Sequence, residues 1–289
     1  MKIAVIGSNG QLGTDLMKVL RERHEVTGLV HRDLEVTDLK ACQILKDLRP
    51  DAIVNTAAFH KTDLCEDEPL KTFSVNAVGA KNVATVAKEI DAVDVFISTD
   101  YVFDGLNKEP YSEDDMPRPI NTYGISKLSG ELLTQLAPRH YVVRIASVFG
   151  AAGASGKGGN FVETMITKAK KSEPISVIED MWMSPTYTVD AASAIMAILE
   201  RRIPFGVYHA SNKGYCSWYQ FTQEIMKQTR LSPSLKPIKA SSFPTKAARP
   251  MFSALRSNRL PNYAVTTRDW QSALKAYLLE KGHIQQRSG

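Results

Sequence analysis

The residues in this chain whose types and spacing suit acid–base chemistry are Tyr123 and Lys127. A spacing of four residues places both side chains on one face of a helix, one turn apart. A phenol has an unperturbed pKa of ~10, so on its own it is a poor proton shuttle at neutral pH. A nearby cation favours the phenolate and lowers that pKa. The pair is therefore a candidate acid–base unit, although Tyr and Lys at this spacing also occur by chance in many helices.

A third candidate, Thr99, lies at the end of an apolar run that begins at Val93 and has the character of a buried strand. The polar stretch from Ser98 to Gly105 follows, and Asp100 comes directly after Thr99. In an open parallel sheet, ligand-binding groups gather at the carboxyl ends of the strands. The Thr99 hydroxyl is therefore placed where it could hydrogen-bond a substrate carbonyl.

The first glycine cluster has the context of a dinucleotide-binding loop. An apolar strand at residues 2–6 leads into Gly7, Gly10 and Gly13, and a helical pattern follows. These glycines suit a tight turn, a close approach to a pyrophosphate and close helix–strand packing, respectively. The helix N-terminus offers free N–H groups to phosphate. A purely structural turn is the alternative, but the order strand, loop, helix favours cofactor binding.

The end of the second strand bears on the choice between NADH and NADPH. In NAD-specific sites of this kind, an acidic residue near this point holds the ribose 2′-hydroxyl. Here the strand, expected at residues 25–30, is followed by His31 and Arg32. A guanidinium suits a 2′-phosphate, which favours NADPH and leaves NADH as the alternative. The competing interpretation makes Arg32 a solvated loop residue that Asp33 neutralises.

The order of strand-like and helix-like segments predicts an α/β fold, namely a doubly wound parallel sheet of the Rossmann type with a smaller C-terminal substrate lobe. We expect residues 1–150 to form a dinucleotide-binding domain, rejoined by about residues 181–203. Residues 151–180 and 204–289 then form the substrate-binding lobe. The Gly-, Ala- and Ser-rich stretch at 150–159 is expected to be a lid or a plain surface loop. Residues 231–262 hold five prolines, so little regular structure is expected there.

Composition excludes several classes of function. The 289 residues are 43% hydrophobic and 23% charged, which is ordinary for a globular protein. The net charge of +5 is spread along the chain, so no nucleic-acid partner is indicated. Cys42, Cys65 and Cys216 are far apart, which predicts neither a disulfide framework nor a metal site. No signal peptide or span-length apolar run is recognisable, so we expect a cytoplasmic protein without a membrane partner.

Together these motifs resemble an extended short-chain dehydrogenase/reductase, and more closely the dTDP-4-dehydrorhamnose reductase family. The resemblance rests on the glycine loop, on Ser98 to Asp100, and on Tyr123 with Lys127, in that order along the chain. The run from Ser98 to Gly105 is the most specific of these motifs. The supporting stretches cover most of the chain, at residues 10–13, 50–55, 98–103, 123–127, 160–161, 184–186 and 249–250.

The resemblance implies NADPH-dependent reduction of the 4-keto group of a nucleotide-linked 4-keto-6-deoxy sugar, as in the formation of dTDP-L-rhamnose. Tyr123 would donate the proton, Thr99 would bind the carbonyl, and Lys127 would lower the pKa of Tyr123 and hold the nicotinamide ribose. The residues expected on the cofactor side, with Arg32 added from the argument above, are Gly7, Asn9, Gly10, Gln11, Leu12, Gly13, Arg32, Glu35, Val36, Ala57, Ala58, Tyr123 and Lys127. Those expected on the substrate side are Thr99, Asp100, Ser147, Asn160 and Arg249.

The substrate side departs from the family more than the cofactor side does. Ser147 stands where some members carry a Trp that helps to hold the sugar, and the stretch at 150–159 is longer than the family leads us to expect. Two alternatives stay open. One is a sugar-nucleotide epimerase or dehydratase, which shares the Thr, Tyr and Lys set. The other is a non-catalytic NADP-binding regulatory subunit like the beta subunit of methionine adenosyltransferase. The resemblance is also compatible with a homodimer, and it does not identify the sugar or the nucleotide.

Overall fold

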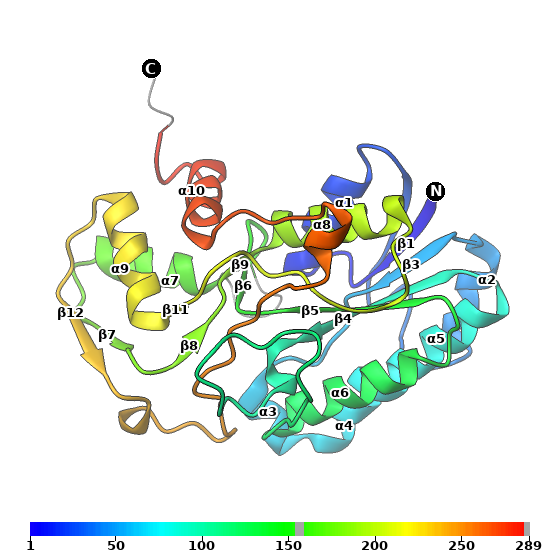
Figure 1. Cartoon of the computed structure of the whole chain (residues 1–289), viewed down its shortest axis with the longest axis horizontal. Coiled ribbons are helices and arrows are strands. Elements are labelled where there is room, and N and C mark those ends of the chain that lie inside the picture. The colour runs from blue at the N-terminus through cyan, green and yellow to red at the C-terminus, as the bar shows by residue number, and fades with distance from the viewer. Residues whose placement is uncertain (154–158, 286–289) are drawn as a thin grey trace.

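A six-stranded parallel sheet forms the centre of the protein, as the computed structural model shows for residues 1–153 and 159–285 (Figure 1). The strand order is β2-β1-β3-β4-β5-β10, so the chain winds outward in both directions from β1 and β3. The strands are β1 (Lys2–Ile6), β2 (Glu25–Leu29), β3 (Ala52–Asn55), β4 (Val93–Thr99), β5 (His140–Ile145) and β10 (Gly206–His209). The predicted doubly wound fold is confirmed, and a ligand is expected in the crevice beyond the carboxyl ends of these strands.

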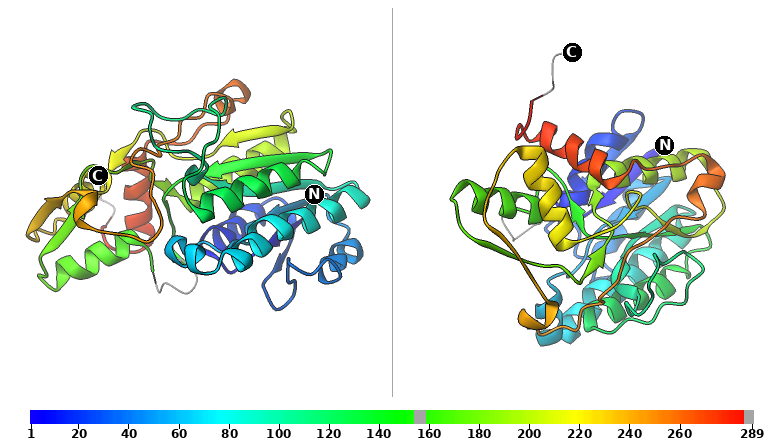
Figure 2. Two further views of the ribbon diagram at one scale, coloured as in Figure 1. Left: turned by 90° about the horizontal axis from the view of Figure 1, so that it is seen from below. Right: turned by 60° about the vertical axis from the view of Figure 1, so that its left-hand side comes forward.

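Helices cover both faces of the sheet (Figures 1 and 2). On one face, α1 (Gln11–Leu20) and α8 (Thr188–Arg201) pack against the aliphatic side chains of alternate strand residues. On the other face lie α2 (Ile44–Leu48), α5 (Gly79–Glu89) and α6 (Thr122–Thr134). Because both faces are buried there, the central strands β1, β3 and β4 are mostly apolar, whereas the edge strand β2 is partly exposed and carries Glu25 and Thr27. This burial explains the short apolar runs in the sequence.

A longer helical run leads into α5. It begins with α4 (Pro69–Phe73), passes through a π-helical segment, η2 (Ser74–Val78), and continues as α5. Such π segments are frequent near functional sites. Here the segment places Asn76 so that its Nδ2 donates to Ser126 Oγ of α6 at 2.9 Å. The π segment therefore joins this helical run to the helix that carries Tyr123 and Lys127.

The C-terminal helices form a second packed unit beside the sheet, built around aromatic residues (Figure 1). Its helices are α7 (Phe161–Lys170), α9 (Trp218–Thr229) and α10 (Trp270–Glu280), with a parallel strand pair of β7 (Ile175–Ile178) and β12 (Leu235–Ile238). Phe149, Phe221 and Tyr277 meet in its core. The remaining short elements are η1 (Ala41–Gln43), α3 (Thr62–Asp67), η3 (Asp100–Val102), β6 (Val148–Phe149), β8 (Trp182–Met183), β9 (Thr186–Tyr187), β11 (Cys216–Ser217), η4 (Ala240–Ser242) and η5 (Leu260–Tyr263).

Two regions differ from the arrangement expected from the sequence, and a third lies partly outside the described residues. Residues 206–209 were placed in the lobe, but they form β10, which pairs in parallel with β5 from Gly206 to His209, so the sheet extends to this point. The proline-rich region 231–262 contains β12, because β7 supplies a partner strand. The proposed lid at 150–159 includes residues 154–158, which lie outside the described part of the chain. Within the described part, no helix is both long and apolar enough to cross a lipid bilayer.

Candidate active site

A cavity of about 970 Å³ lies at the carboxyl ends of the central strands and extends to the first residues of α7 and α9. It brings together almost all of the residues expected to bind cofactor or substrate. Those that line it are Gly7, Asn9, Gly10, Gln11, Leu12, Gly13, Glu35, Val36, Ala57, Ala58, Thr99, Asp100, Tyr123, Lys127, Ser147, Asn160 and Arg249. Arg32 is the exception, because it lies outside the lining residues and its side chain is 88% exposed.

The glycine loop has the geometry of a phosphate cradle. Gly7 adopts φ +76°, which L side chains rarely tolerate, and its N–H donates to Leu29 O at 2.8 Å. A Cβ on Gly13 would lie 2.1 Å from Gly7 O, so no larger residue fits there without moving the loop. These two positions keep the backbone close to the cavity. The roles expected for Gly7 and Gly13 therefore agree with the geometry of the loop.

The N-terminus of α1 faces this cradle without a side-chain cap, since Gly10 occupies the N-cap. Its free N–H groups and positive dipole end suit a diphosphate. Gln11 Nε2 donates to Val148 O at 3.0 Å, whereas the buried Gln11 Oε1 has no partner in the structure. A buried acceptor without a partner is costly and indicates a missing donor. The loop, the helix end and this orphaned oxygen fit a dinucleotide.

The end of the cavity where the adenosine is expected contains the carboxylate of Glu35, whereas the expected guanidinium of Arg32 lies outside the cavity. Glu35 Oε1 accepts from the N–H and the hydroxyl of Thr37, both at 2.9 Å, and Glu35 Oε2 lies 3.1 Å from His31 Nδ1. His31, Glu35 and Thr37 all line the cavity. Arg32 Nε lies 3.5 Å from Asp33 Oδ1 on the surface. Recognition of a 2′-phosphate by Arg32 therefore stays a prediction that requires the side chain to turn inward.

Tyr123 lies on the cavity wall in the first turn of α6. Asn121 caps this helix, because its side chain accepts from the N–H of Gly124 at 2.7 Å. Burial raises the pKa of the Tyr123 phenol well above its ordinary value, a hydrogen bond with Thr99 acts in the opposite direction, and the Asp100 charge raises it further. The phenol is therefore protonated at neutral pH. This state suits a proton donor, and the expected lowering of the pKa by Lys127 is not among the causes of the shift.

Lys127 is fully buried beside Tyr123. Its Nζ donates to Ile97 O at 2.6 Å and lies 4.0 Å from the centre of the Phe96 ring. Burial lowers the pKa of Lys127 to about 7, while the charge of Glu131 raises it. The pKa of a lysine falls readily when its ammonium group is removed from solvent. The ammonium is therefore close to its titration point at neutral pH, and neighbouring charges decide its state.

Thr99 and Asp100 end β4 next to the phenol. Thr99 Oγ1 donates to Asp100 Oδ1 at 3.1 Å, and Ser253 Oγ donates to Asp100 Oδ2 at 2.5 Å. Burial raises the pKa of Asp100 to about 6, although the bonds from Ser253 and Thr99 lower it. Asp100 is thus held from both sides by hydroxyl groups. Ser253 comes from the C-terminal third of the chain, so this contact joins the lobe to the sheet.

Three further residues reach the cavity from separate segments. Ser147 adopts φ +42°, an uncommon backbone for a residue with a side chain. Asn160 caps α7, and its Nδ2 donates to Gly150 O and to Tyr277 Oη, both at 3.0 Å. Arg249 Nη2 lies 3.2 Å from Asp63 Oδ2, and its buried Nε has no partner in the structure. The folded chain therefore assembles the expected substrate side from parts that are distant in sequence.

Sequence reasoning missed several aromatic residues of the cavity. The Tyr101 ring stands edge-on to Tyr123 with centroids 6.0 Å apart. The ring centroids of Phe161 and Trp218 lie 4.6 Å apart at the starts of α7 and α9, and both residues line the cavity. Tyr101 could have been found, since it lies within the specific motif at 98–105, but nothing in the sequence pairs Phe161 with Trp218. Within the described residues, no group of His, Cys, Asp or Glu could hold a metal ion.

Comparison with known proteins agrees with this geometry. Residues 1–282 match the family described as the RmlD substrate binding domain. The chain is 36% identical over 283 residues to the spore coat polysaccharide biosynthesis protein SpsK of Bacillus subtilis (strain 168). This match covers 97% of this chain and 98% of that protein. It is 33% identical over 290 residues to the dTDP-4-dehydrorhamnose reductase of Aggregatibacter actinomycetemcomitans, covering 95% and 97% respectively.

Among solved structures, it is similar to the dTDP-4-dehydrorhamnose reductase of Bacillus anthracis str. Ames in complex with NADP. The TM-score is 0.91 at 34% identity, and the match covers 96% of this chain and 99% of that chain. The family match spans nearly the full length and agrees with the order of the motifs. The chain therefore belongs to the RmlD family of extended short-chain dehydrogenase/reductases.

Proposed function

We propose that this protein is an NADPH-dependent reductase of the 4-keto group of a nucleotide-linked 4-keto-6-deoxy sugar, with dTDP-4-dehydrorhamnose as the first substrate to test. One observation carries the proposal, namely that Thr99, Tyr123 and Lys127 line the same cavity as the glycine loop. Relatives of more than 30% identity that bear the name dTDP-4-dehydrorhamnose reductase support the choice of sugar. The proposed products are NADP⁺ and the sugar with a hydroxyl at C4.

The proposed chemistry divides between cofactor and protein. NADPH supplies the hydride that adds to the carbonyl carbon. Negative charge then grows on the carbonyl oxygen, and the protonated Tyr123 phenol donates a proton to it. Thr99 orients the carbonyl, and the Lys127 ammonium stabilises the phenolate that remains. Because burial keeps the pKa of Tyr123 high, the phenol enters the reaction as the acid, which is the form that a reduction requires.

The remaining lining residues would bind the two ligands. On the cofactor side, the glycine loop and the α1 N-terminus would hold the diphosphate, and Glu35, Val36, Ala57 and Ala58 would surround the adenosine. On the substrate side, Asp100, Ser147 and Asn160 would contact the sugar. Arg249, whose guanidinium is the basic group among the expected substrate contacts, would bind the nucleotide diphosphate.

The direct test is NADPH consumption by the purified protein with a panel of nucleotide-linked 4-keto-6-deoxy sugars. We expect loss of NADPH absorbance in equal amount to the sugar reduced. A matched control is the same sugar with a hydroxyl at C4, which should consume none. Product analysis by NMR then identifies the configuration at C4.

Two outcomes would favour the alternatives. A sugar altered without net loss of NADPH would indicate an epimerase or dehydratase, which recycles its bound cofactor. Tight NADPH binding with no sugar reduced would point to a regulatory subunit, and capture of a partner enzyme would then be the next experiment. Either result would overturn the reductase proposal.

Two further parts of the proposal concern place and assembly. We place the protein in the cytoplasm, because NADPH and nucleotide-linked sugars are made there. We also propose a homodimer, for which the exposed apolar side chains of Ile125 and Leu132 on α6, and of Leu136 just after it, provide a contact face. Molar mass from light scattering tests the assembly, and a monomer at micromolar concentration would contradict it.

A further inference from the structure

A buried ion pair lies directly behind the proposed catalytic helix. Glu131 follows Lys127 by one turn of α6, and Arg144 of β5 binds its carboxylate with two hydrogen bonds, Nε to Oε1 at 2.9 Å and Nη2 to Oε2 at 2.7 Å. The two side chains are 5% and 4% exposed. Ser98 Oγ of β4 adds a third bond to Oε1 at 2.5 Å. A buried pair of this kind is weak evidence for stability, because removing both charges from water is expensive.

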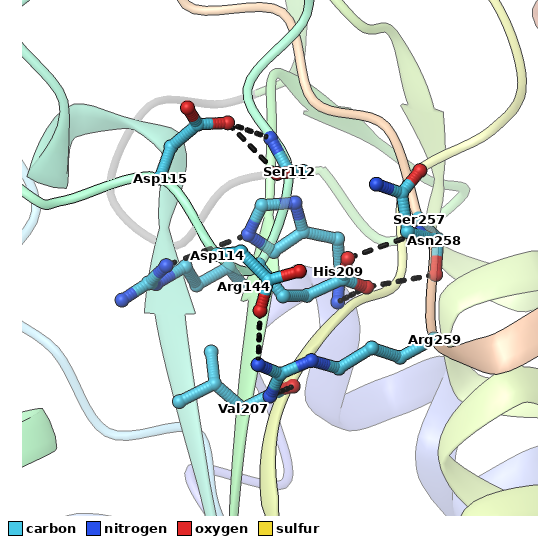
Figure 3. Close-up of polar contacts among 10 residues, drawn as sticks. Ser112, Asp114, Asp115, Arg144, Val207, His209, Ser257, Asn258 and Arg259 are labelled. Carbon is cyan, nitrogen blue, oxygen red and sulfur yellow. Dashed lines mark hydrogen bonds and ion pairs between the residues drawn. The ribbon is translucent and has the colours of Figure 1, made fainter.

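The far side of Arg144 meets an uncharged ring. Its Nη1 lies 3.5 Å from His209 Nε2, and Figure 3 shows the two groups facing each other. His209 Nδ1 lies 3.0 Å from the carbonyl oxygen of Arg256, so Nδ1 carries the proton and Nε2 is the acceptor. Burial lowers the pKa of His209 to about 4, which keeps the ring neutral. Glu131 is thus the carboxylate that balances Arg144.

A second carboxylate, Glu113, closes the other end of this network. Its Oε1 accepts from His209 N at 3.2 Å and Ser257 Oγ at 3.0 Å, and its Oε2 accepts from Asn258 N at 2.9 Å. Glu113 is buried like Glu131 and belongs to the same polar network. The difference is position, since His209 and Arg144 stand between Glu113 and α6. The structure therefore contains two buried glutamates of which only Glu131 lies beside Lys127.

The charge on Lys127 depends on few neighbours. Among the described residues, no carboxylate contacts Nζ, whose hydrogen bond goes to Ile97 O. The η2 segment contributes no titratable group, and the charged side chains of α5 are exposed. The titratable and charged groups on α6 and on the other elements packed around Lys127 are Tyr123 and Glu131 on α6, Asp94, Asp100 and Tyr101 on β4 and η3, His140, Tyr141 and Arg144 on β5, and Asp63, Cys65, Glu66, Asp67 and Lys71 on α3 and α4. Of these, Glu131 supplies the charge that favours the ammonium.

We propose that Glu131 is a positioning residue whose carboxylate, clamped by Ser98 and Arg144, keeps the buried Lys127 in its ammonium form. The clamp holds the charge one helical turn away and prevents a direct ion pair, so Nζ stays available to the cavity. A carboxylate in a low-dielectric interior acts over such a separation. The proposal rests on the proposed function only where it concerns catalysis, because the effect on Lys127 exists without substrate.

The test is the titration of Lys127 itself, followed by ¹³C NMR of lysine side chains in labelled protein. Loss of one resonance in Lys127→Met assigns the signal. In Glu131→Gln we expect the Lys127 titration to move to lower pH by about one unit, the lower end of the effect of an opposite charge at close range. The matched control, Glu113→Gln, removes an equally buried carboxylate and should leave the titration unchanged. Glu131→Asp, which keeps the charge, should restore most of the wild-type value.

Thermal unfolding of the same variants separates this role from a structural one. If Glu131→Gln fails to fold because Arg144 loses its carboxylate, the Glu131→Gln/Arg144→Gln double variant buries no unmatched charge and should show the same direction of shift. A folded Glu131 variant in which Lys127 titrates as in the wild type would overturn the proposal, as would an equal shift in Glu113→Gln. If the wild-type protein reduces no keto-sugar, the proposed function is wrong, but the titration of Lys127 still tests the role of Glu131.

Discussion

The cofactor half and the substrate half of the cavity are built in different ways. The expected cofactor half combines the glycine loop and the start of α1, within residues 2–20, with Glu35, Val36, Ala57 and Ala58, and its loop has backbone N–H groups that suit a phosphate. The substrate half takes Ser147, Asn160 and Arg249 from three segments that only the fold brings together. A cradle of backbone groups should tolerate many side-chain changes but not an added Cβ. A set of converging side chains should tolerate added volume but not the loss of a charge.

Tyr123 lies where the two halves meet, so its replacement should have the largest effect. Tyr123→Phe removes the donor oxygen and keeps the ring, and we expect kcat to fall on the order of 10²–10⁴-fold, as for loss of a general acid. NADPH affinity, measured by fluorescence titration, should stay close to the wild type. Tyr215→Phe, outside the cavity, is the control. A Tyr123→Phe enzyme with near-normal turnover would remove Tyr123 from the mechanism.

The packing of the cofactor half can be tested by adding a single methyl group. A Cβ at Gly13 would lie 2.1 Å from Gly7 O, whereas one at Gly159, on the lobe side, would lie 3.7 Å from Glu163 Cβ. Overpacking costs ~1–3 kcal/mol, so Gly13→Ala should weaken NADPH binding by roughly 5- to 150-fold. Gly159→Ala should leave it nearly unchanged in the same calorimetric titration. Equal losses in both variants would mean that the halves do not differ in this respect.

Substrate binding by the other half can be tested by removing the charge of Arg249. Hydrogen bonds to charged groups contribute ~1.5–3 kcal/mol, so Arg249→Ala should raise the KM for the nucleotide sugar by roughly 10- to 150-fold. Arg249→Lys should recover part of this loss, because it restores the charge but not the planar fork. NADPH affinity should not change in either variant. A KM close to that of the wild type in Arg249→Ala would place the diphosphate elsewhere.

Arg32 tests the edge of the cofactor half. Exposed charge pairs contribute ~0–1 kcal/mol, so Arg32→Ala should change the ratio of NADPH to NADH affinity by less than about fivefold. His31→Ala, which removes a ring that lines the cavity, is the matched variant at the same turn. The two dissociation constants, measured for each variant, give the ratio. A tenfold or larger change in Arg32→Ala would show that the guanidinium turns inward when NADPH binds.

The smallest expected effect lies in the sheet itself, at Asp94 on β4. Its Oδ1 is buried without a partner, and burial raises the pKa of Asp94 from 3.8 to about 8. The folded state therefore holds a proton that the unfolded state has already lost, so this contribution to stability declines as the pH rises from about 4 to about 8. Asp94→Asn does not titrate and should raise the melting temperature by a few degrees at pH 8, and by less at pH 5. An equal gain at both pH values would contradict the buried charge as the cause.

The features that depend on local chemistry could be predicted from the residues and their spacing. A strand that leads into glycines and then a helix can form few structures, because positive φ at Gly7 and close packing at Gly13 exclude other residues. The spacing of Tyr123 and Lys127 placed them together on one helix, and the strand end placed Thr99 beside them. These relations span a few residues each, so periodicity and residue type were sufficient to predict them.

Other features depend on contacts between segments that are distant in the chain. Residues 206–209 became a sheet strand because β5 was left with a free edge, and β12 formed because β7 lay beside it. Arg32 points to solvent although its place in the chain suggested a role at the ribose. The carboxylate near Lys127 belongs to Glu131 of α6, and Ser98 of β4 and Arg144 of β5 hold it in place. Burial and the direction of a side chain depend on residues far away in sequence, so no local pattern carries that information.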